Sequence, residues 1–174
     1  SAGDRIAYDR SSDGQYLVYQ TDHPGDLGGG NLDLWARQLP GGRPFAFLRT
    51  VQAASRATLS PDGSRVAYIS LEGGREDVYV ARFQSYDGRR RISVGGGSWS
   101  RWSRDGSEIF YLDPDNQIMA APVESGSSDL GAGTPRALFQ VRTSPNRGYA
   151  YDVSADGQRF LVSVVGDVVG DVSN

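Results

Sequence analysis

The chain has 174 residues, 38% of them hydrophobic and 22% charged, a composition typical of a folded globular domain and not of a disordered segment. Its net charge of −3 argues against nucleic acid as a partner, and its lack of cysteine excludes disulfides, thiol nucleophiles and cysteine-ligated metal sites. The 23 glycines and nine tyrosines favour short strands joined by tight turns, and no apolar run of about 18 residues is present to insert into a membrane.

The motif Ser-x-Asp-Gly occurs four times along the chain. Its copies span residues 11–14, 60–63, 103–106 and 154–157, which places successive aspartates 49, 43 and 51 residues apart. Glycine takes a positive φ without steric cost, and serine or aspartate can hydrogen-bond the turn backbone, so each motif is expected to close a hairpin. The spacing matches one four-stranded β-propeller blade per repeat, which takes about 40 to 50 residues.

A strand in fixed register is predicted after each motif. The fourth, fifth and sixth positions after the aspartate are Leu17, Val18 and Tyr19, then Val66, Ala67 and Tyr68, then Ile109, Phe110 and Tyr111, and finally Phe160, Leu161 and Val162. Neighbouring positions on a strand point to opposite faces, so these runs predict strands covered on both faces, as in stacked sheets.

Third and fourth strands complete the predicted blades. Third strands are expected at 33–39, 77–83 and 117–123, and fourth strands at 45–49, 90–94 and 137–141. Pro122 fits only where the ladder has slack, because proline has no N–H to donate. The arginines at 89–91 are typical of a protected outer edge.

The fold class predicted is all-β: one domain over residues 1–174, built of β-propeller blades with four antiparallel strands. Blades are expected at about 4–50, 51–97 and 98–143, with an incomplete blade at 147–174. These three and a half to four blades stand at the lower end of the four to eight that close a ring. Because an open ring exposes apolar faces, we expect either missing upstream blades or self-association.

The innermost strand of each blade precedes its motif and should line the central channel. The residues four positions before the motif aspartates are Asp9, Thr58, Arg101 and Asp152, and two residues six positions before them are Arg56 and Trp99. With Tyr149 as a second aromatic wall, this set is the predicted site for a polar ligand or a peptide end. The alternative is that the charges only pair with one another.

We expect no catalytic residue, metal site or cofactor. His23 is the single histidine and has no nucleophile elbow to serve. Asp22, His23 and Asp26 are better explained as a solvated turn than as metal ligands, and residues 113–116 as a hairpin turn than as a calcium loop.

The stretch 60–83 resembles the TolB-type, WD40-like (PD40) propeller repeat, with its Ser-Pro-Asp-Gly and its third strand Asp77-Val78-Tyr79-Val80. Residues 99–112, 133–139 and 151–162 resemble the C-terminal sensor propellers of bacterial serine/threonine kinases. The resemblance implies a non-catalytic sensor or protein-interaction module of a larger protein, located in the periplasm or otherwise outside the cytoplasm, with a protein or peptide partner.

Two alternative functions stay open at this point. The chain could be the gating propeller of a prolyl-oligopeptidase-like peptidase, whose hydrolase domain would lie elsewhere. It could also be a carbohydrate-processing propeller, for which Asp9 and Asp152 are the candidate carboxylate pair.

Overall fold

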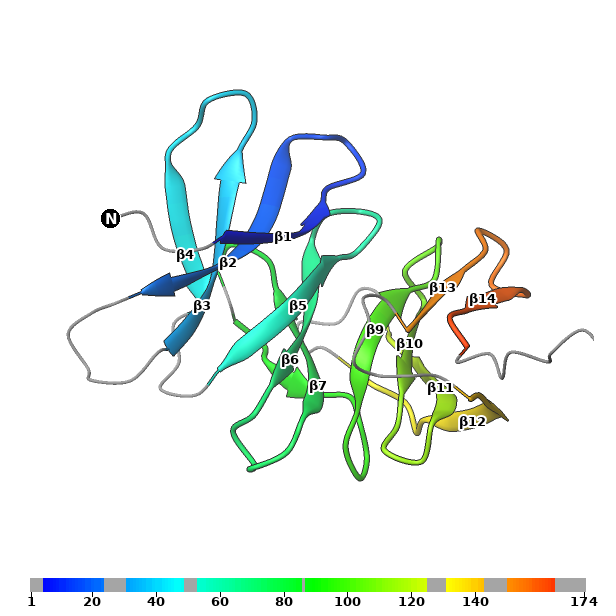
Figure 1. Cartoon of the computed structure of the whole chain (residues 1–174). Coiled ribbons are helices and arrows are strands. Elements are labelled where there is room, and N and C mark those ends of the chain that lie inside the picture. The colour runs from blue at the N-terminus through cyan, green and yellow to red at the C-terminus, as the bar shows by residue number, and fades with distance from the viewer. Residues whose placement is uncertain are drawn as a thin grey trace, which may run out of the picture.

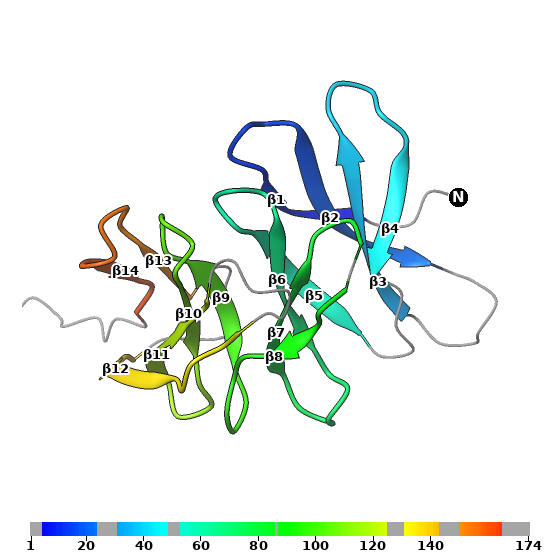
Figure 2. The ribbon, with the colours of Figure 1, turned by 180° about the vertical axis from the view of Figure 1, so that it is seen from behind.

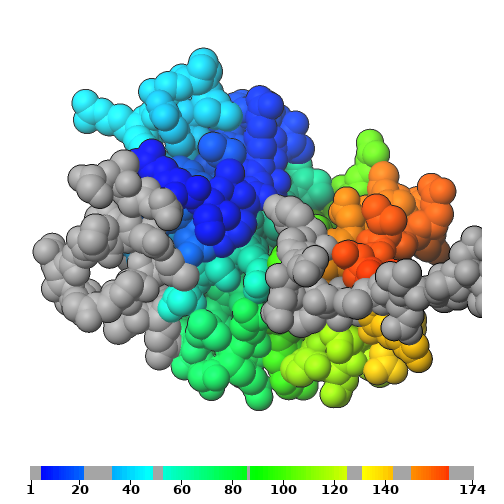
Figure 3. Space-filling view, in the orientation of Figure 1, coloured from blue at the N-terminus to red at the C-terminus, as the bar shows by residue number. Residues whose placement is uncertain are grey.

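The computed structural model describes residues 5–23, 31–48, 53–85, 87–124, 131–142 and 150–164. These residues form antiparallel β-sheets and no helix, which confirms the predicted all-β class. The four sheets follow one another across the molecule in chain order, from blue to orange (Figures 1, 2 and 3). None of the described residues belongs to a helix that could cross a membrane.

Three of the sheets have four strands each. The first sheet contains β1 (Arg5–Arg10), β2 (Tyr16–His23), β3 (Asn31–Gln38) and β4 (Pro44–Leu48). The second contains β5 (Ala54–Leu59), β6 (Arg65–Ser70), β7 (Asp77–Arg82) and β8 (Arg90–Arg91). The third contains β9 (Ser98–Trp102), β10 (Glu108–Leu112), β11 (Gln117–Pro122) and β12 (Arg136–Gln140). The fourth consists of β13 (Tyr151–Val153) and β14 (Phe160–Val162).

Each Ser-x-Asp-Gly motif closes the hairpin between the first and second strands of its sheet. In the second sheet, the Ser60 hydroxyl donates to Asp62 at 2.5 Å and accepts the backbone N–H of Arg65 at 2.9 Å. The Asp62 carboxylate accepts the N–H of Ser64 at 3.0 Å, and Gly63 has a φ of 70°. The same two serine contacts and aspartate contact recur in the other three motifs.

The hydrophobic core lies between successive sheets. At each interface, the fifth residue after one motif aspartate and the fourth residue after the next belong to the same apolar cluster. These pairs are Val18 with Val66, Ala67 with Ile109, and Phe110 with Phe160. The second strands of the second and third sheets, β6 and β10, are therefore covered on both faces, by the preceding sheet on one side and the following sheet on the other.

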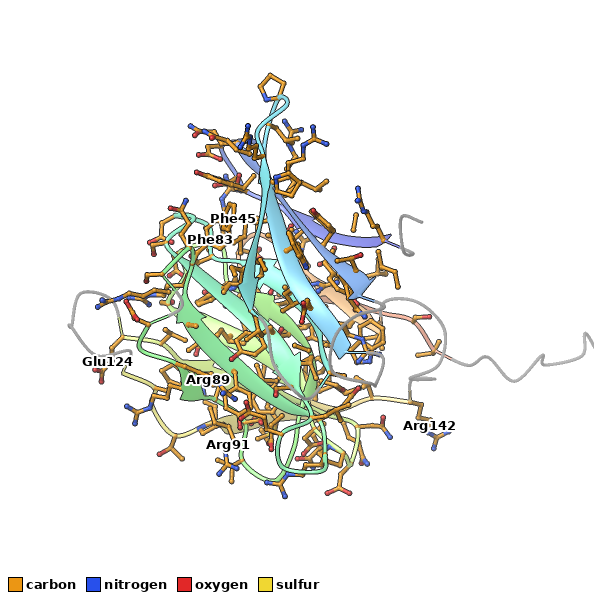
Figure 4. The ribbon with its side chains drawn as sticks, turned by 90° about the vertical axis from the view of Figure 1, so that its left-hand side faces the viewer. Phe45, Phe83, Arg89, Arg91, Glu124 and Arg142 are labelled. Atoms are coloured by element: carbon orange, nitrogen blue, oxygen red, sulfur yellow. The ribbon has the colours of Figure 1, made fainter. Side chains whose placement is uncertain are left out.

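Aromatic rings fill the outer part of the first interface. Phe83 lies 6.2 Å from Phe45, measured between ring centroids, and the two rings lie near each other in Figure 4. The ring of Tyr16 lies 5.3 Å from that of Phe83. Both contacts join the first and second sheets, because Phe83 immediately follows β7. These rings thus extend the apolar core between the first two sheets to their outer strands.

The fourth strand of the second sheet is shorter than the predicted 90–94. It ends at Arg91, because the N–H groups of Ile92 and Ser93 both point to the single carbonyl of Val78, at 2.8 and 3.4 Å. The hydroxyl of Ser93 in turn accepts the N–H of Val78 at 3.0 Å and donates to the buried Asp77 at 2.7 Å. Side-chain hydrogen bonds thus replace the ladder at this edge.

Candidate ligand-binding site

The innermost strands β1, β5, β9 and β13 contribute to the wall of an open cavity of about 790 Å³. All four residues that stand four positions before a motif aspartate line it: Asp9, Thr58, Arg101 and Asp152. Tyr8, Leu59, Trp102, Tyr151 and Leu161 are among the other residues of its wall. The repeat therefore brings one residue from each sheet to the same cavity, with charged groups beside apolar ones.

Asp9 is tied to the backbone through both of its carboxylate oxygens. Oδ2 accepts the N–H of Leu59 from the second sheet at 2.7 Å, and Oδ1 accepts the N–H of Arg10 at 2.8 Å. Burial raises the pKa of Asp9 above its usual value, although both hydrogen bonds and the charge of Arg101 act in the opposite direction. The group therefore links two sheets and contributes a partly desolvated carboxylate to the cavity.

Arg101 and Asp152 form a loose ion pair across the cavity wall. Arg101 Nε lies 3.7 Å from Asp152 Oδ1, and the side chains are 19% and 72% exposed. Arg101 also donates from Nη1 to the carbonyl of Ser100 at 3.0 Å. Because Asp152 is largely solvated, this pair is of the weak kind, worth about 1 kcal/mol or less, and a ligand can compete for it.

Two buried hydroxyl groups of the wall have no hydrogen-bond partner among the described residues. They are Thr58 Oγ1 and the phenol of Tyr151, a residue only 3% exposed. Burial raises the pKa of Tyr151 well above its usual range, so the hydroxyl stays protonated as a donor. A buried polar group left without a partner costs about 1 to 3 kcal/mol, so both hydroxyls have unused hydrogen-bonding capacity beside the cavity.

Arg56 and Trp99, the predicted channel residues six positions before their aspartates, do not line this cavity. They lie against each other, with the Arg56 guanidinium 4.1 Å from the centroid of the Trp99 ring. Arg56 also pairs with Glu76 at 3.0 Å. Both residues have positive φ, 52° and 56°, at irregularities in β5 and β9. Tyr149 lies outside the described residues.

Sequence reasoning did not single out Tyr151 and Trp102 as parts of the cavity wall. Trp102 is 9% exposed and donates from Nε1 to the carbonyl of Thr58 at 3.1 Å. The position five before the motif aspartate is tyrosine in the first and fourth blades, Tyr8 and Tyr151, but alanine and serine in the other two. The position three before it holds Arg10, Leu59 and Val153 besides Trp102. No residue type common to all blades marked either position, and the tyrosine shared by two blades was the only signal in the sequence.

Within the ranges that the structure describes, no group of three or more histidine, aspartate or glutamate residues could hold a metal ion. The side chains of Asp22 and His23 and the whole of residues 24–30, which the sequence favours as a solvated turn over a weak metal site, lie outside those ranges.

No protein-family model matches the sequence, and no curated protein matches it. Solved structures do resemble its fold. TolB from Acinetobacter baumannii is 18% identical and aligns over 94% of this chain and 44% of its own, with a TM-score of 0.58. An oligogalacturonate lyase in complex with manganese is 16% identical over 94% of this chain and 45% of its own, with a TM-score of 0.63.

The β-propeller domain of the Trilobed protease from Pyrococcus furiosus is 10% identical over 82% of this chain and 59% of its own, with a TM-score of 0.53. The chain thus spans about half the length of the solved chains that it resembles. At these identities the likeness concerns the fold alone, and it confirms the predicted propeller architecture of about three to four blades, the first to fourth sheets.

Proposed function

We propose that this β-propeller segment is a non-catalytic binding module, a sensor or interaction domain of a larger protein. Its cavity takes a small polar ligand or the end of a peptide. The observation that carries the proposal is the cavity of about 790 Å³, into whose wall the repeat brings one polar residue from each of the four blades.

The chemistry of the wall supports a polar ligand held beside apolar surface. Tyr151 and Thr58 have buried hydroxyls with hydrogen-bonding capacity that no described residue uses. Arg101 supplies a positive charge, and Asp152 a negative one that is held only loosely. Pockets that combine apolar walls with a few convergent polar groups are the usual form of small-ligand sites.

The bonding of Asp9 favours binding over catalysis by paired carboxylates. Both of its oxygens accept backbone N–H groups, at 2.7 and 2.8 Å. A carboxylate acting as nucleophile or general acid must direct an oxygen at the substrate. Asp9 is instead used to join blades, which leaves Asp152 without a second carboxylate suited to that chemistry among the described residues of the cavity wall.

The sensor role also draws on the sequence resemblance to the propellers of bacterial serine/threonine kinases. The proposal that this segment is one part of a larger protein is consistent with its covering about half the length of the solved chains that it resembles. Among those, the Trilobed protease carries its propeller as one domain of a protease. A gating role beside a peptidase domain remains the second candidate.

The proposal is tested by ligand-observed NMR with a library of polar fragments and short peptides whose ends are free or blocked. Hits should lose affinity about tenfold in Tyr151→Phe, which removes one hydroxyl, since a single hydrogen bond of about 1.4 kcal/mol corresponds to a factor of ten. Tyr19→Phe is the matched control, because Tyr19 is also buried but does not line the cavity. Absence of any hit sensitive to Tyr151→Phe, or chemical turnover of a hit, would overturn the proposal.

A further inference from the structure

Three arginine side chains gather at the outer edge of the second blade, where β8 is the outermost strand (Figure 2). Arg75 Nε lies 3.2 Å from Asp77 Oδ2, and Arg91 Nη1 lies 3.9 Å from the same oxygen. Arg89 donates from Nη1 to Glu72 at 2.6 Å, and its Nη2 donates to the second oxygen of that carboxylate. Figure 4 shows Arg89 and Arg91 near each other at this edge. These ion pairs join three guanidinium groups to two carboxylates, which leaves one positive charge in excess.

The carboxylate that Arg75 and Arg91 share is held from inside the blade. Asp77 is 1% exposed, and its other oxygen accepts the hydroxyl of Ser93 at 2.7 Å. The side chains of Arg75 and Arg91 are 50% and 53% exposed. Because two half-exposed guanidinium groups approach one carboxylate oxygen, their N–H donors outnumber the acceptors that Asp77 offers them. Both groups can therefore donate to a further carboxylate from the solvent side.

Arg89 is held against aromatic rings. Its guanidinium lies 4.2 Å from the centroid of the Tyr79 ring, and that ring stacks on the buried Tyr68 with the centroids 5.8 Å apart. A side chain that is already ordered loses less conformational freedom when a partner binds. The positive charge of Arg89 is thus presented in a fixed place beside β8.

The backbone of β8 is open along its outer side. In the described part of the chain, β8 pairs only with β7, through Arg90 and Arg91. Just beyond the strand, the N–H of Ile92 points inward to the carbonyl of Val78 at 2.8 Å. Since the backbone groups of alternate residues point to opposite sides of an antiparallel strand, those of Arg91 point away from the sheet. An extended peptide can use them to add as a further strand.

The charge of this edge decides which peptide fits. Arginines on an edge strand repel another copy of the same edge, which protects against aggregation, but they attract a strand of opposite charge. A long polyanion such as nucleic acid would meet the field of the whole chain, whose net charge is −3, whereas a short acidic segment meets only this edge. Val94 is 70% exposed and stands three residues after Arg91, where it offers the segment an apolar contact.

We propose that the outer edge of the second blade, formed by Arg75, Arg89, Arg90 and Arg91, docks an extended acidic segment of a partner protein. The segment lies along β8 and places its carboxylates on Arg75 and Arg91. None of the four arginines lines the cavity, so this surface is separate from the proposed ligand site.

The test is fluorescence anisotropy with a labelled, end-blocked peptide in which glutamate and valine alternate, and with the same peptide carrying glutamine in place of glutamate. Alternation puts all the carboxylates on one face of an extended chain. The acidic peptide should bind the unmodified chain at least about tenfold more tightly than the glutamine peptide, and its affinity should fall as salt is added. This comparison needs no variant, so it does not depend on whether a variant folds.

Arg91→Gln assigns the binding to the edge and should weaken the acidic peptide at least about tenfold. Arg142→Gln is the matched control, because Arg142 is an exposed arginine that follows β12, the outermost strand of the third sheet. It lies apart from Arg89 and Arg91 in Figure 4. Its substitution removes the same charge and should leave the affinity unchanged. Circular dichroism verifies that both variants keep their strands.

Equal binding of the acidic and the glutamine peptide would overturn the proposal, as would equal effects of Arg91→Gln and Arg142→Gln. An oligouridylate that bound more tightly than the acidic peptide and lost its binding in Arg91→Gln would also overturn it, by assigning the edge to nucleic acid. None of these results bears on the cavity ligand, whose binding is measured separately with Tyr151→Phe.

Discussion

The carboxylate of Asp9 in the first blade accepts the backbone N–H of Leu59 in the second blade at 2.7 Å. The donor belongs to a residue that is only 6% exposed, so water cannot readily replace the acceptor. One side chain thereby provides the partner of a main-chain group across a blade interface. This hydrogen bond therefore lies in the wall of the cavity and also holds the first and second blades together.

Asp9→Ala should lower the free energy of unfolding by about 1 to 3 kcal/mol, because the N–H of Leu59 is left buried without an acceptor. Asp152→Ala is the control from the equivalent position: its side chain is 72% exposed, and its loss should change stability by no more than about 0.5 kcal/mol. Urea titration followed by tryptophan fluorescence measures both. Equal effects would show that the contact between blades contributes nothing specific.

Ser60→Ala should destabilise by about 1 to 3 kcal/mol. Ser60 is 3% exposed, and its hydroxyl is the acceptor for the N–H of Arg65 at 2.9 Å. Ser154 makes the same contact with Arg159 at 3.0 Å in an exposed turn, where water can take its place. Ser154→Ala should therefore cost clearly less in the same unfolding experiment, and a reversed order would contradict this account of the motif.

The motif aspartates should make stability fall at acid pH. Hydrogen bonds from the Ser103 hydroxyl and from the N–H and hydroxyl of Ser107 lower the pKa of Asp105 from 3.8 to about 2. Because the folded pKa lies below the usual value, the stabilisation is complete above about pH 3.8 and is lost as the pH falls toward 2.

Asp105→Asn removes this titrating group, so the free energy of unfolding should decline less steeply between those two pH values. Unfolding titrations of both proteins across the interval measure the difference. An unchanged slope would mean that the carboxylate is no better stabilised in the folded chain than in the unfolded one.

Ile109→Ala should cost about 2 to 5 kcal/mol and Ile109→Val about 0.5 to 1.5 kcal/mol, since Ile109 is fully buried between the second and third blades. Leu161→Ala removes a similar volume from a side chain that is 78% exposed, and should change the stability by about 0.5 kcal/mol or less. Thermal unfolding compares the three variants.

Arg56→Gly should be more stable than Arg56→Ala by about 1 kcal/mol. Both variants remove the guanidinium that lies on Trp99, so their difference isolates the backbone, which has a φ of 52° at this position. Glycine adopts this conformation freely, whereas a residue with a Cβ pays about 1 to 2 kcal/mol, partly offset by the greater freedom of glycine when unfolded. Equal stability would indicate that the main chain relaxes in the variants.

The strand register was predictable from the sequence because it depends on local patterns. Val66, Ala67 and Tyr68 are all fully buried, as consecutive apolar residues at fixed distance from a turn indicate. The positions of Asp9 and Arg101 at a common cavity followed from the same counting. Both inferences require only two facts: side chains alternate between the two faces of a strand, and the same turn recurs in each blade.

The separation of Arg56 from Thr58 was not predictable in this way. On a regular strand, residues two apart share a face, which would put both at the cavity. An irregularity between Ser55 and Thr58 breaks that alternation and turns Arg56 toward Trp99 instead. A bulge of this kind depends on how neighbouring strands pair. The sequence of β5 gives no sign of it, because the residue with positive φ is Arg56 and not a glycine.

Each Ser-x-Asp-Gly turn is satisfied by hydrogen bonds among residues five positions apart or fewer, as between Ser60 and Arg65. The hairpin therefore does not depend on how long the connections elsewhere in the blade are, and the repeat spacings of 49, 43 and 51 residues differ without changing it. Insertions and deletions in those connections leave the register intact. The gene segment that encodes one blade can accordingly be duplicated in tandem during evolution. It can also change in length, while the Ser-x-Asp-Gly turn of each copy folds as before.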